Sequence, residues 1–150
     1  MAKRQLDLLE GQVQDAIKKG AGVIIGGKVP ENLSGAFYEP TILTNITKDM
    51  RVWTEEVFGP VLPVVSFKTE EEAIELANDT PYGLGSRVYS KDIDRAKRVA
   101  SKIKAGTVEI NHVSRWLPCN PFGGFKNSGM GREHGTAGFH ELCQIKVISM

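Results

Sequence analysis

The side chains best suited to chemistry lie in stretches rich in turn-forming residues. They are carboxylates and aromatics, at Glu56, Phe58, Trp116, Phe122 and Glu133. Aromatic rings beside a carboxylate suit a pocket that holds a planar ring or an apolar substrate. For Glu56 and its neighbour Glu55, a solvated position without function is the alternative. The residues alone therefore indicate a small-molecule site and define no reaction.

One glycine-rich segment, residues 121–133, stands at the centre of this set. It reads Pro-Phe-Gly-Gly-Phe-Lys-Asn-Ser-Gly-Met-Gly-Arg-Glu, with four glycines between Phe122 and Arg132. Glycines this close together indicate turns with positive φ, or close approach to another group. Loops of this kind often carry sites on a rigid scaffold, and a plain surface loop is the alternative.

The sequence lacks the patterns that are typical of a metal site, a phosphate-binding loop or a nucleophilic cysteine. The histidines and cysteines form neither a CxxC pair nor an HExxH helix, so we expect no metal. Gly129-x-Gly131 follows a loop and not a strand, and no Walker pattern exists, so the usual phosphate cradles are absent. Cys119 has cationic neighbours in sequence, but sequence proximity alone does not make it a nucleophile. We expect Cys119 and Cys143 to be unpaired, buried or half-buried thiols.

Composition narrows the class of protein. The 150 residues are the size of one domain, and 41% of them are hydrophobic. A net charge of +1 gives no electrostatic case for nucleic acid or an anionic membrane as partner. No apolar run reaches membrane-spanning length, and the first residues lack a secretory pattern. We therefore expect a cytoplasmic protein.

Hydrophobic periodicity predicts the elements that must position these residues. Helices are expected at about 3–19, at 69–77 from a capping box of Thr69 and Glu72, to about 103 from a cap at Ser90 or Asp92, and at 137–142. A single helical turn is expected near 49–53. Strands are expected at 23–25, 37–43, 61–67, 84–89, 107–111 and 145–150. The alternation from 61 to 111 indicates an α/β layer with parallel neighbouring strands. No internal domain boundary is expected, and the last strand needs a neighbouring edge with which to pair.

Four motifs resemble those of the aldehyde dehydrogenase superfamily, in the same order. They are Glu55-Glu56-Val57-Phe58-Gly59-Pro60, Ala77-Asn78-Asp79-Thr80-x-Tyr82-Gly83-Leu84, Ala105-Gly106-Thr107-Val108-x-Ile110-Asn111 and the segment 121–133. The resemblance covers nearly the whole chain. It implies an α/β fold in which residues 1–143 form part of a catalytic domain, with a mostly parallel sheet and flanking helices. Residues 144–150 would begin the C-terminal strand that joins an oligomerisation sheet.

The resemblance also implies an activity and roles for single residues. The family oxidises an aldehyde to a carboxylic acid with NAD or NADP, so an aldehyde substrate and a homo-oligomer are implied. Glu56 would accept hydrogen bonds from the nicotinamide ribose hydroxyls, and Phe58 would pack beside the nicotinamide. Glu133 would be an outer carboxylate in a proton or water path. The residues that would line or shape the aldehyde site are Trp116, Cys119, Asn120 and Phe122.

Other parts of the family's machinery are missing from these 150 residues. The nucleophilic cysteine sits in a Gly-Gln-x-Cys context that does not occur here. The general-base glutamate, the oxyanion-hole asparagine and the Rossmann-type cofactor domain are likewise absent. We therefore expect a C-terminal fragment that is inactive alone.

Two alternative functions, and the chemical class of the aldehyde, stay open. A non-catalytic module that self-associates through its unpaired last strand is the alternative. An independent nucleotide-binding domain is disfavoured because no phosphate cradle is present. Arg115 suggests the hypothesis that the substrate carries a carboxylate, as a semialdehyde does. The alternative is that Arg115 is solvated and has no role in substrate binding.

Overall fold

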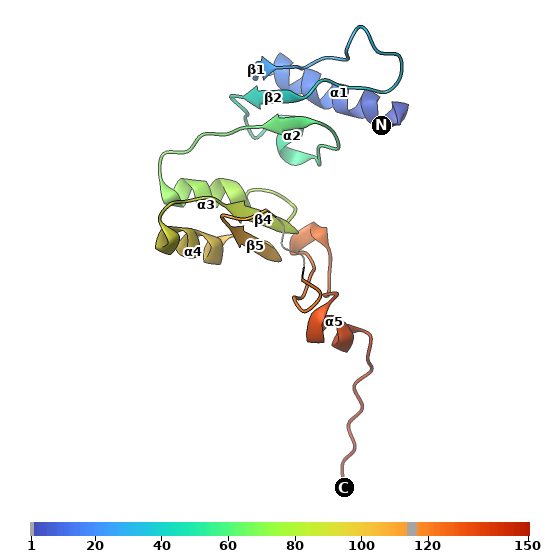
Figure 1. Cartoon of the computed structure of the whole chain (residues 1–150), viewed down its shortest axis with the longest axis vertical. Coiled ribbons are helices and arrows are strands. Elements are labelled where there is room, and N and C mark those ends of the chain that lie inside the picture. Colours follow the sequence, from blue (N-terminus) through green and yellow to red (C-terminus); the bar gives the residue numbers. More distant parts are fainter. Residues whose placement is uncertain (1, 114–116) are drawn as a thin grey trace. The chain divides into compact units, whose positions relative to one another are not determined.

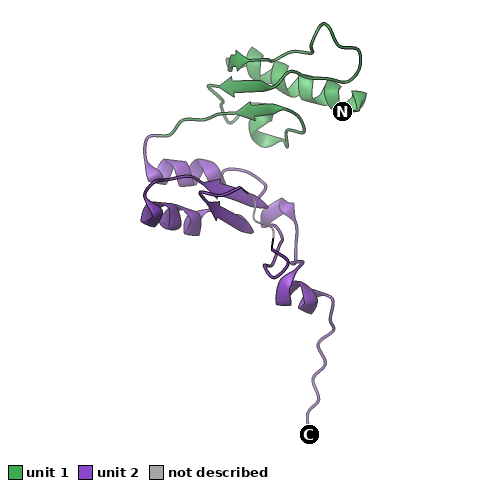
Figure 2. Cartoon of the chain, viewed as in Figure 1, with its two compact units in different colours: residues 1–67 green, residues 68–150 purple. Residues whose placement is uncertain are grey.

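The computed structural model describes residues 2–113 and 117–150. The chain divides into two compact units, residues 1–67 and 68–150 (Figure 2). Arg115 and Trp116 lie outside the described residues, so the roles expected for them stay predictions.

The first unit packs one long helix against a three-stranded sheet (Figure 1). Its elements are α1 (Lys3–Lys18), β1 (Gly22–Ile25), β2 (Thr41–Thr44), α2 (Arg51–Thr54) and β3 (Val61–Pro63). The strand order is β1-β2-β3, antiparallel between the first two and parallel between the last two. The apolar stripe predicted for the helix is confirmed, because it buries Leu9 and Val13 against Leu43 and Met50.

The second unit places two helices beside a parallel pair of strands (Figure 1). Its elements are α3 (Glu70–Asn78), β4 (Gly85–Val88), α4 (Ile93–Lys102), β5 (Thr107–Ile110), the 3₁₀ turn η1 (Lys126–Ser128) and α5 (Gly135–Glu141). β4 and β5 pair in parallel, from Gly85 opposite Thr107 to Val88 opposite Ile110.

Side-chain caps start both longer helices of this unit where the sequence predicts them. The Thr69 hydroxyl accepts a hydrogen bond from the Glu72 amide at 3.2 Å, and the Asp92 carboxylate accepts one from the Arg95 amide at 2.9 Å. The Glu72 carboxylate also accepts from the Lys68 amide at 2.7 Å, so the two groups form a capping box at the start of α3.

The α/β class is confirmed, but the single layer expected from 61 to 111 is wrong. β3 ends at Pro63 and pairs with β2 of the first unit, while β4 and β5 form a separate sheet. The Val64 amide still donates to the Leu43 carbonyl at 2.8 Å, so the whole start of this segment hydrogen-bonds to β2. Alternation in sequence fixes the type of each element and leaves its pairing partner open.

The strand expected at 145–150 is absent from the described chain, where these residues have no regular structure. Ile145 is 95% exposed, and Val147 and Ile148 are also exposed. A strand needs a neighbouring edge, and none of the described strands pairs with this segment. The division at residues 143 and 144 stays a prediction.

Among residues 2–113 and 117–150, no helix combines the length and the apolar character that crossing a membrane requires.

Candidate functional site

The first group of candidate residues lies in the loop that follows α2. Glu56 and Phe58 are both exposed, and Phe58 is 61% exposed. Between them, Val57 packs against the hydrophobic core of the first unit. The loop therefore holds its middle residue inward and presents a carboxylate and an aromatic ring outward.

Helix α1 holds this loop through its backbone. The Gln12 amide group donates to the Glu56 carbonyl at 3.1 Å, and the Gln5 amide group donates to the Phe58 carbonyl at 3.2 Å. A methyl group added at Gly59 would lie 2.3 Å from a methyl carbon of the fully buried Leu9, so only glycine fits there. Three side chains on one face of α1, spaced by four and three residues, thus support the loop.

A charged pair fixes the first residue of the loop. The Arg51 guanidinium donates two hydrogen bonds to the Glu55 carboxylate, at 2.8 and 2.9 Å. This bidentate contact, with a further hydrogen bond from Gln12 at 3.0 Å, holds the pKa of Glu55 below its ordinary value. Glu55 is therefore ionised and structurally engaged at neutral pH, whereas the neighbouring Glu56 carboxylate points to solvent.

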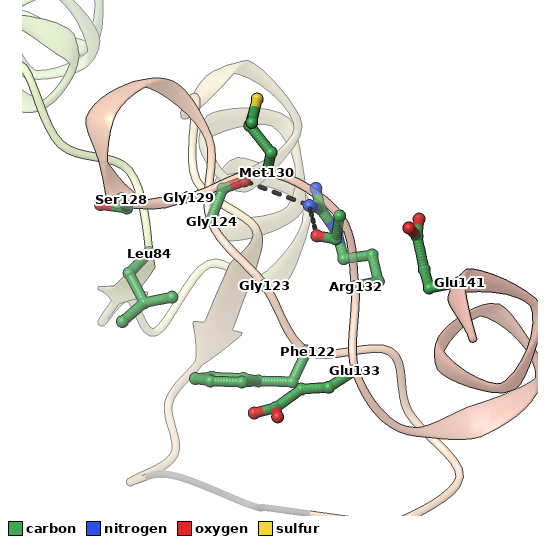
Figure 3. Close-up of a pocket in the computed structure, with 11 residues that line it drawn as sticks. Leu84, Phe122, Gly123, Gly124, Ser128, Gly129, Met130, Arg132, Glu133 and Glu141 are labelled. Carbon is green, nitrogen blue, oxygen red and sulfur yellow. Dashed lines mark hydrogen bonds between the residues drawn. The ribbon is translucent and has the colours of Figure 1, made fainter.

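The second group lies on the glycine-rich segment of the second unit. Phe122 and Glu133, eleven residues apart, pair as an antiparallel bridge, with amide-to-carbonyl distances of 2.7 and 2.8 Å. Figure 3 shows the Phe122 ring beside the Glu133 side chain. The intervening loop reverses through Lys126, Gly129 and Gly131, which all have positive φ. The prediction of turns with positive φ is confirmed.

The Arg132 side chain hydrogen-bonds to the backbone of this loop. Its guanidinium donates to the carbonyls of Gly124, at 3.1 Å, and Gly131, at 2.6 Å (Figure 3). The guanidinium carbon also lies 5.4 Å from the centre of the Phe125 ring, in cation–π geometry. Arg132 is thus a structural brace of the loop, because its donors are directed at backbone carbonyls.

The turn at residues 78–83 anchors the same loop from outside. The Lys126 ammonium donates to the carbonyls of Asn78 and Thr80, both at 2.8 Å. The Ser128 hydroxyl accepts from the Gly83 amide at 2.9 Å, and the Phe125 amide donates to the Gly83 carbonyl at 2.9 Å. With a fifth hydrogen bond, from the Asn127 amide to the Pro81 carbonyl at 3.0 Å, these contacts fix the loop on its scaffold.

An open cavity of about 500 Å³ lies along the glycine-rich segment. Its lining includes Phe122, Glu133 and the carboxylate-bearing Glu141 of α5 (Figure 3). Of the predicted site residues that the structure describes, Phe122 and Glu133 line it. Glu56 and Phe58 belong to the first unit.

Cys119 and Asn120 lie in the loop before the glycine-rich segment. The Cys119 sulfur lies 3.8 Å from the Asn120 side-chain oxygen. The expectation of buried or half-buried thiols is wrong, because Cys119 and Cys143 are both exposed and unpaired. Cys119 stands in a solvated loop, and Cys143 follows the end of α5, so neither position offers a core to enter. Among the residues that the structure describes, no three or more histidine, cysteine or carboxylate side chains gather as metal ligands.

Sequence reasoning missed the supports of both groups, above all Gln12. A weak signal was present, since Gln12 interrupts the apolar stripe between Leu9 and Val13 and is only 1% exposed. A polar residue at such a position needs a hydrogen-bond partner. No local pattern identifies a partner that lies more than forty residues further along the chain.

The chain is similar to curated enzymes. It is 50% identical to a succinate-semialdehyde dehydrogenase [NADP(+)] of Deinococcus radiodurans over 140 residues, which is 93% of this chain and 29% of the relative. It is also 50% identical to a betaine aldehyde dehydrogenase of Bacillus subtilis over 143 residues, again 93% of this chain and 29% of the relative. The chain thus spans less than a third of the length of these relatives.

Solved structures agree in fold. A betaine aldehyde dehydrogenase of Staphylococcus aureus in complex with NAD+ is 46% identical, with a TM-score of 0.87, and the match covers 93% of this chain and 28% of that one. An aldehyde dehydrogenase of Mycobacterium tuberculosis with NAD+ is 39% identical, also with a TM-score of 0.87, over 93% and 29%. The sequence model described as "Aldehyde dehydrogenase family" matches residues 1–148. The chain therefore belongs to the aldehyde dehydrogenase family.

Proposed function

We propose that these residues form part of an enzyme that oxidises an aldehyde to a carboxylic acid with NAD or NADP. The observation that carries the proposal is the 46% identity and the TM-score of 0.87 to an enzyme solved with NAD+. The fold-level match alone would support only a shared architecture. The identity, combined with four family motifs in order, extends the argument to the site.

Glu56 and Phe58 are proposed to hold the nicotinamide end of the cofactor. An exposed carboxylate on a loop with a fixed backbone suits this role, because it accepts two hydrogen bonds from adjacent ribose hydroxyls. The exposed Phe58 ring offers an apolar face for the nicotinamide. A bound cofactor would supply the acceptor for a hydride, and these two residues would fix the position of its nicotinamide.

Phe122 and Glu133 are proposed to act on the substrate side. The half-buried ring of Phe122 would line the aldehyde site, together with Asn120, Cys119 and Trp116. The exposed Glu133 carboxylate, bridged through its backbone to Phe122, would serve an outer proton or water path. Both residues line the same cavity, which supports this assignment.

The identity of the aldehyde is a finer proposal. A semialdehyde carries a carboxylate and betaine aldehyde a quaternary ammonium, and relatives named for each substrate are 50% identical to this chain. A carboxylate-bearing substrate rests on Arg115 alone. It predicts that Arg115→Ala, made in a chimera that joins this chain to the remaining segments of an intact relative, raises KM for succinate semialdehyde and leaves KM for a neutral aldehyde unchanged. An equal effect on both substrates would refute it.

The test compares two proteins offered NAD, NADP and a panel of short aldehydes. The 150-residue chain alone is expected to give no turnover, because no Gly-Gln-x-Cys nucleophile occurs in it. A chimera, in which the chain replaces the matching segment of the Staphylococcus aureus enzyme, is expected to reduce the cofactor. Turnover by the 150 residues alone would contradict the proposed division of catalytic groups.

A second candidate, a self-associating assembly module, is favoured by one observation. Residues 144–150 are exposed and unpaired, and they include Ile145, Val147 and Ile148. Pairing of this segment with the sheet edge of a second copy would bury these side chains. Sedimentation should then show an oligomer that a deletion of 144–150 converts to monomer. A monomer before deletion would count against this candidate.

A further inference from the structure

One buried polar side chain in α1, Gln12, lies outside the four family motifs. Gln12 lies on the apolar face of the helix, next to the fully buried Leu9 and Val13, and is 1% exposed itself. Burying an amide side chain costs free energy unless hydrogen bonds compensate for the lost water. Its place in the core therefore depends on the partners that it finds there.

Those partners are the two carboxylate residues at the start of the Glu55–Pro60 loop. The Gln12 nitrogen donates to the Glu55 carboxylate at 3.0 Å and to the Glu56 carbonyl at 3.1 Å. Both partners are acceptors only, so the nitrogen and not the oxygen of the amide must face them. The Gln12 oxygen has no hydrogen-bond partner among the described residues. The hydrogen bonds of the Gln12 side chain in the core are therefore those that its nitrogen donates to Glu55 and Glu56.

These contacts fix the backbone from which the Glu56 side chain projects. The Glu55 side chain is fixed by Arg51 and Gln12, and the Glu56 carbonyl is fixed by Gln12. The peptide group between the two residues is therefore held from both sides. The Glu56 carboxylate makes no hydrogen bond within the described chain, so the direction of its Cα–Cβ bond is set by this backbone alone.

We propose that Gln12 is the positioning residue that orients Glu56 toward the nicotinamide ribose. The inference rests on the proposed function, because it requires Glu56 to be the ribose-binding carboxylate. Gln12 itself is enclosed in the core and acts only through the loop. A buried support of this kind preorganises a binding group, so its loss should weaken cofactor binding and leave the aldehyde site unchanged.

The first test measures loop order in the 150-residue chain, without cofactor. Gln12→Met keeps the length and apolar stem of the side chain and removes the donor. Backbone amide order parameters at 55–58 should be above about 0.8 in the unaltered chain and fall below about 0.6 in the variant. Gln14→Met is the matched control, since Gln14 is two residues away on the same helix and makes no described hydrogen bond. Unchanged order parameters in Gln12→Met would overturn the inference.

The second test measures kinetics in the chimera described above. Gln12→Met should raise KM for NAD about tenfold, as expected for one or two lost hydrogen bonds, with less than about a twofold change in KM for the aldehyde. A parallel rise in both KM values would indicate general damage and would overturn the positioning role.

The two tests separate this inference from the proposed function. If loop order falls while KM for NAD stays constant, Gln12 holds the loop but Glu56 does not bind the ribose. In that case Glu56→Gln should also leave KM for NAD unchanged, and the cofactor role assigned to Glu56 fails with it. If loop order stays and Glu56→Gln raises KM for NAD, the proposed function stands and only the role of Gln12 is refuted.

Discussion

Gly106, the residue directly before β5, should be the least replaceable glycine of the second unit. A methyl group added there would lie 1.7 Å from the carbonyl oxygen of Gly123 and 3.4 Å from that of Leu84. The partners are backbone atoms, which no change of rotamer can move away. Gly106→Ala must therefore separate β5 from the glycine-rich segment.

The cost follows from the distances. Ordinary contact begins at 3.4 Å, so the segments must part by roughly 1.7 Å. Overpacking of this kind costs about 1–3 kcal/mol. The separation also strains the hydrogen bonds from the Gly106 amide to the Gly83 carbonyl, at 3.0 Å, and from Thr107 to Leu84, at 3.1 Å, each contributing about 1 kcal/mol. We expect a destabilisation of about 3 kcal/mol or more, a large share of the stability of a small domain.

Urea denaturation measures this effect, with amide NMR spectra following the second unit separately from the first. A loss of about 3 kcal/mol should lower the midpoint of the second unit by about 2 M at an m-value near 1.5 kcal/mol/M. The matched control is Gly85→Ala on the adjacent strand, where no atom lies within 4 Å and φ is not positive. It should be neutral or slightly stabilising. Equal midpoints for the two variants would refute the reasoning.

Three further predictions concern ion pairing, burial and capping. Arg98 donates two hydrogen bonds of 2.7 Å to Glu70, and they lower the pKa of that carboxyl below its ordinary value of 4.5. The ion pair therefore stabilises the fold above pH 4.5, and this stabilisation is lost as pH falls through the lowered pKa. Arg98→Met should therefore lower the urea midpoint at pH 7 and leave it unchanged at about pH 2. Burial raises the pKa of Tyr38 to about 12, so the stability that this group contributes below pH 10 should be lost as pH rises through 12. Ultraviolet titration should show one phenol ionising near pH 12. Thr69→Ala removes the α3 cap and should cost about 1 kcal/mol by urea denaturation, while Ser66→Ala, in the preceding exposed segment, should cost nothing measurable.

Local patterns predicted the elements well because their causes are local. Helix α1 follows from an apolar stripe, α3 starts at the side chain of Thr69 as expected, and α4 starts at Asp92, one of its two expected caps. The turn at 78–83 and the reversals of the glycine-rich segment also follow from residue type, because glycine adopts positive φ without strain. These predictions require only neighbouring residues.

The errors concern relations between distant residues. β3 pairs with β2 across about twenty residues, and nothing in its own sequence distinguishes that partner from β4. The exposure of Cys119 depends on where its loop packs, and the Gln12 contacts join residues more than forty positions apart. The segment 145–150 has a strand-like composition, but a ladder requires a second edge. Sequence reasoning supplied the candidates, and only the folded chain shows what supports them.

The motif at 77–84 explains why a family signature need not consist of reactive groups. Its Asn78 side chain donates to the Lys102 carbonyl at 3.0 Å and accepts from the Lys104 amide at 2.7 Å, which ties the end of α3 to the end of α4. The carbonyl of the same residue receives Lys126 from the glycine-rich segment. One asparagine thus connects the helical layer to the loop that carries Phe122 and Glu133. The motif at 77–84 therefore marks the framework that supports the candidate site residues Phe122 and Glu133, and Gln12, outside any motif, supports the backbone of Glu56 in the same way.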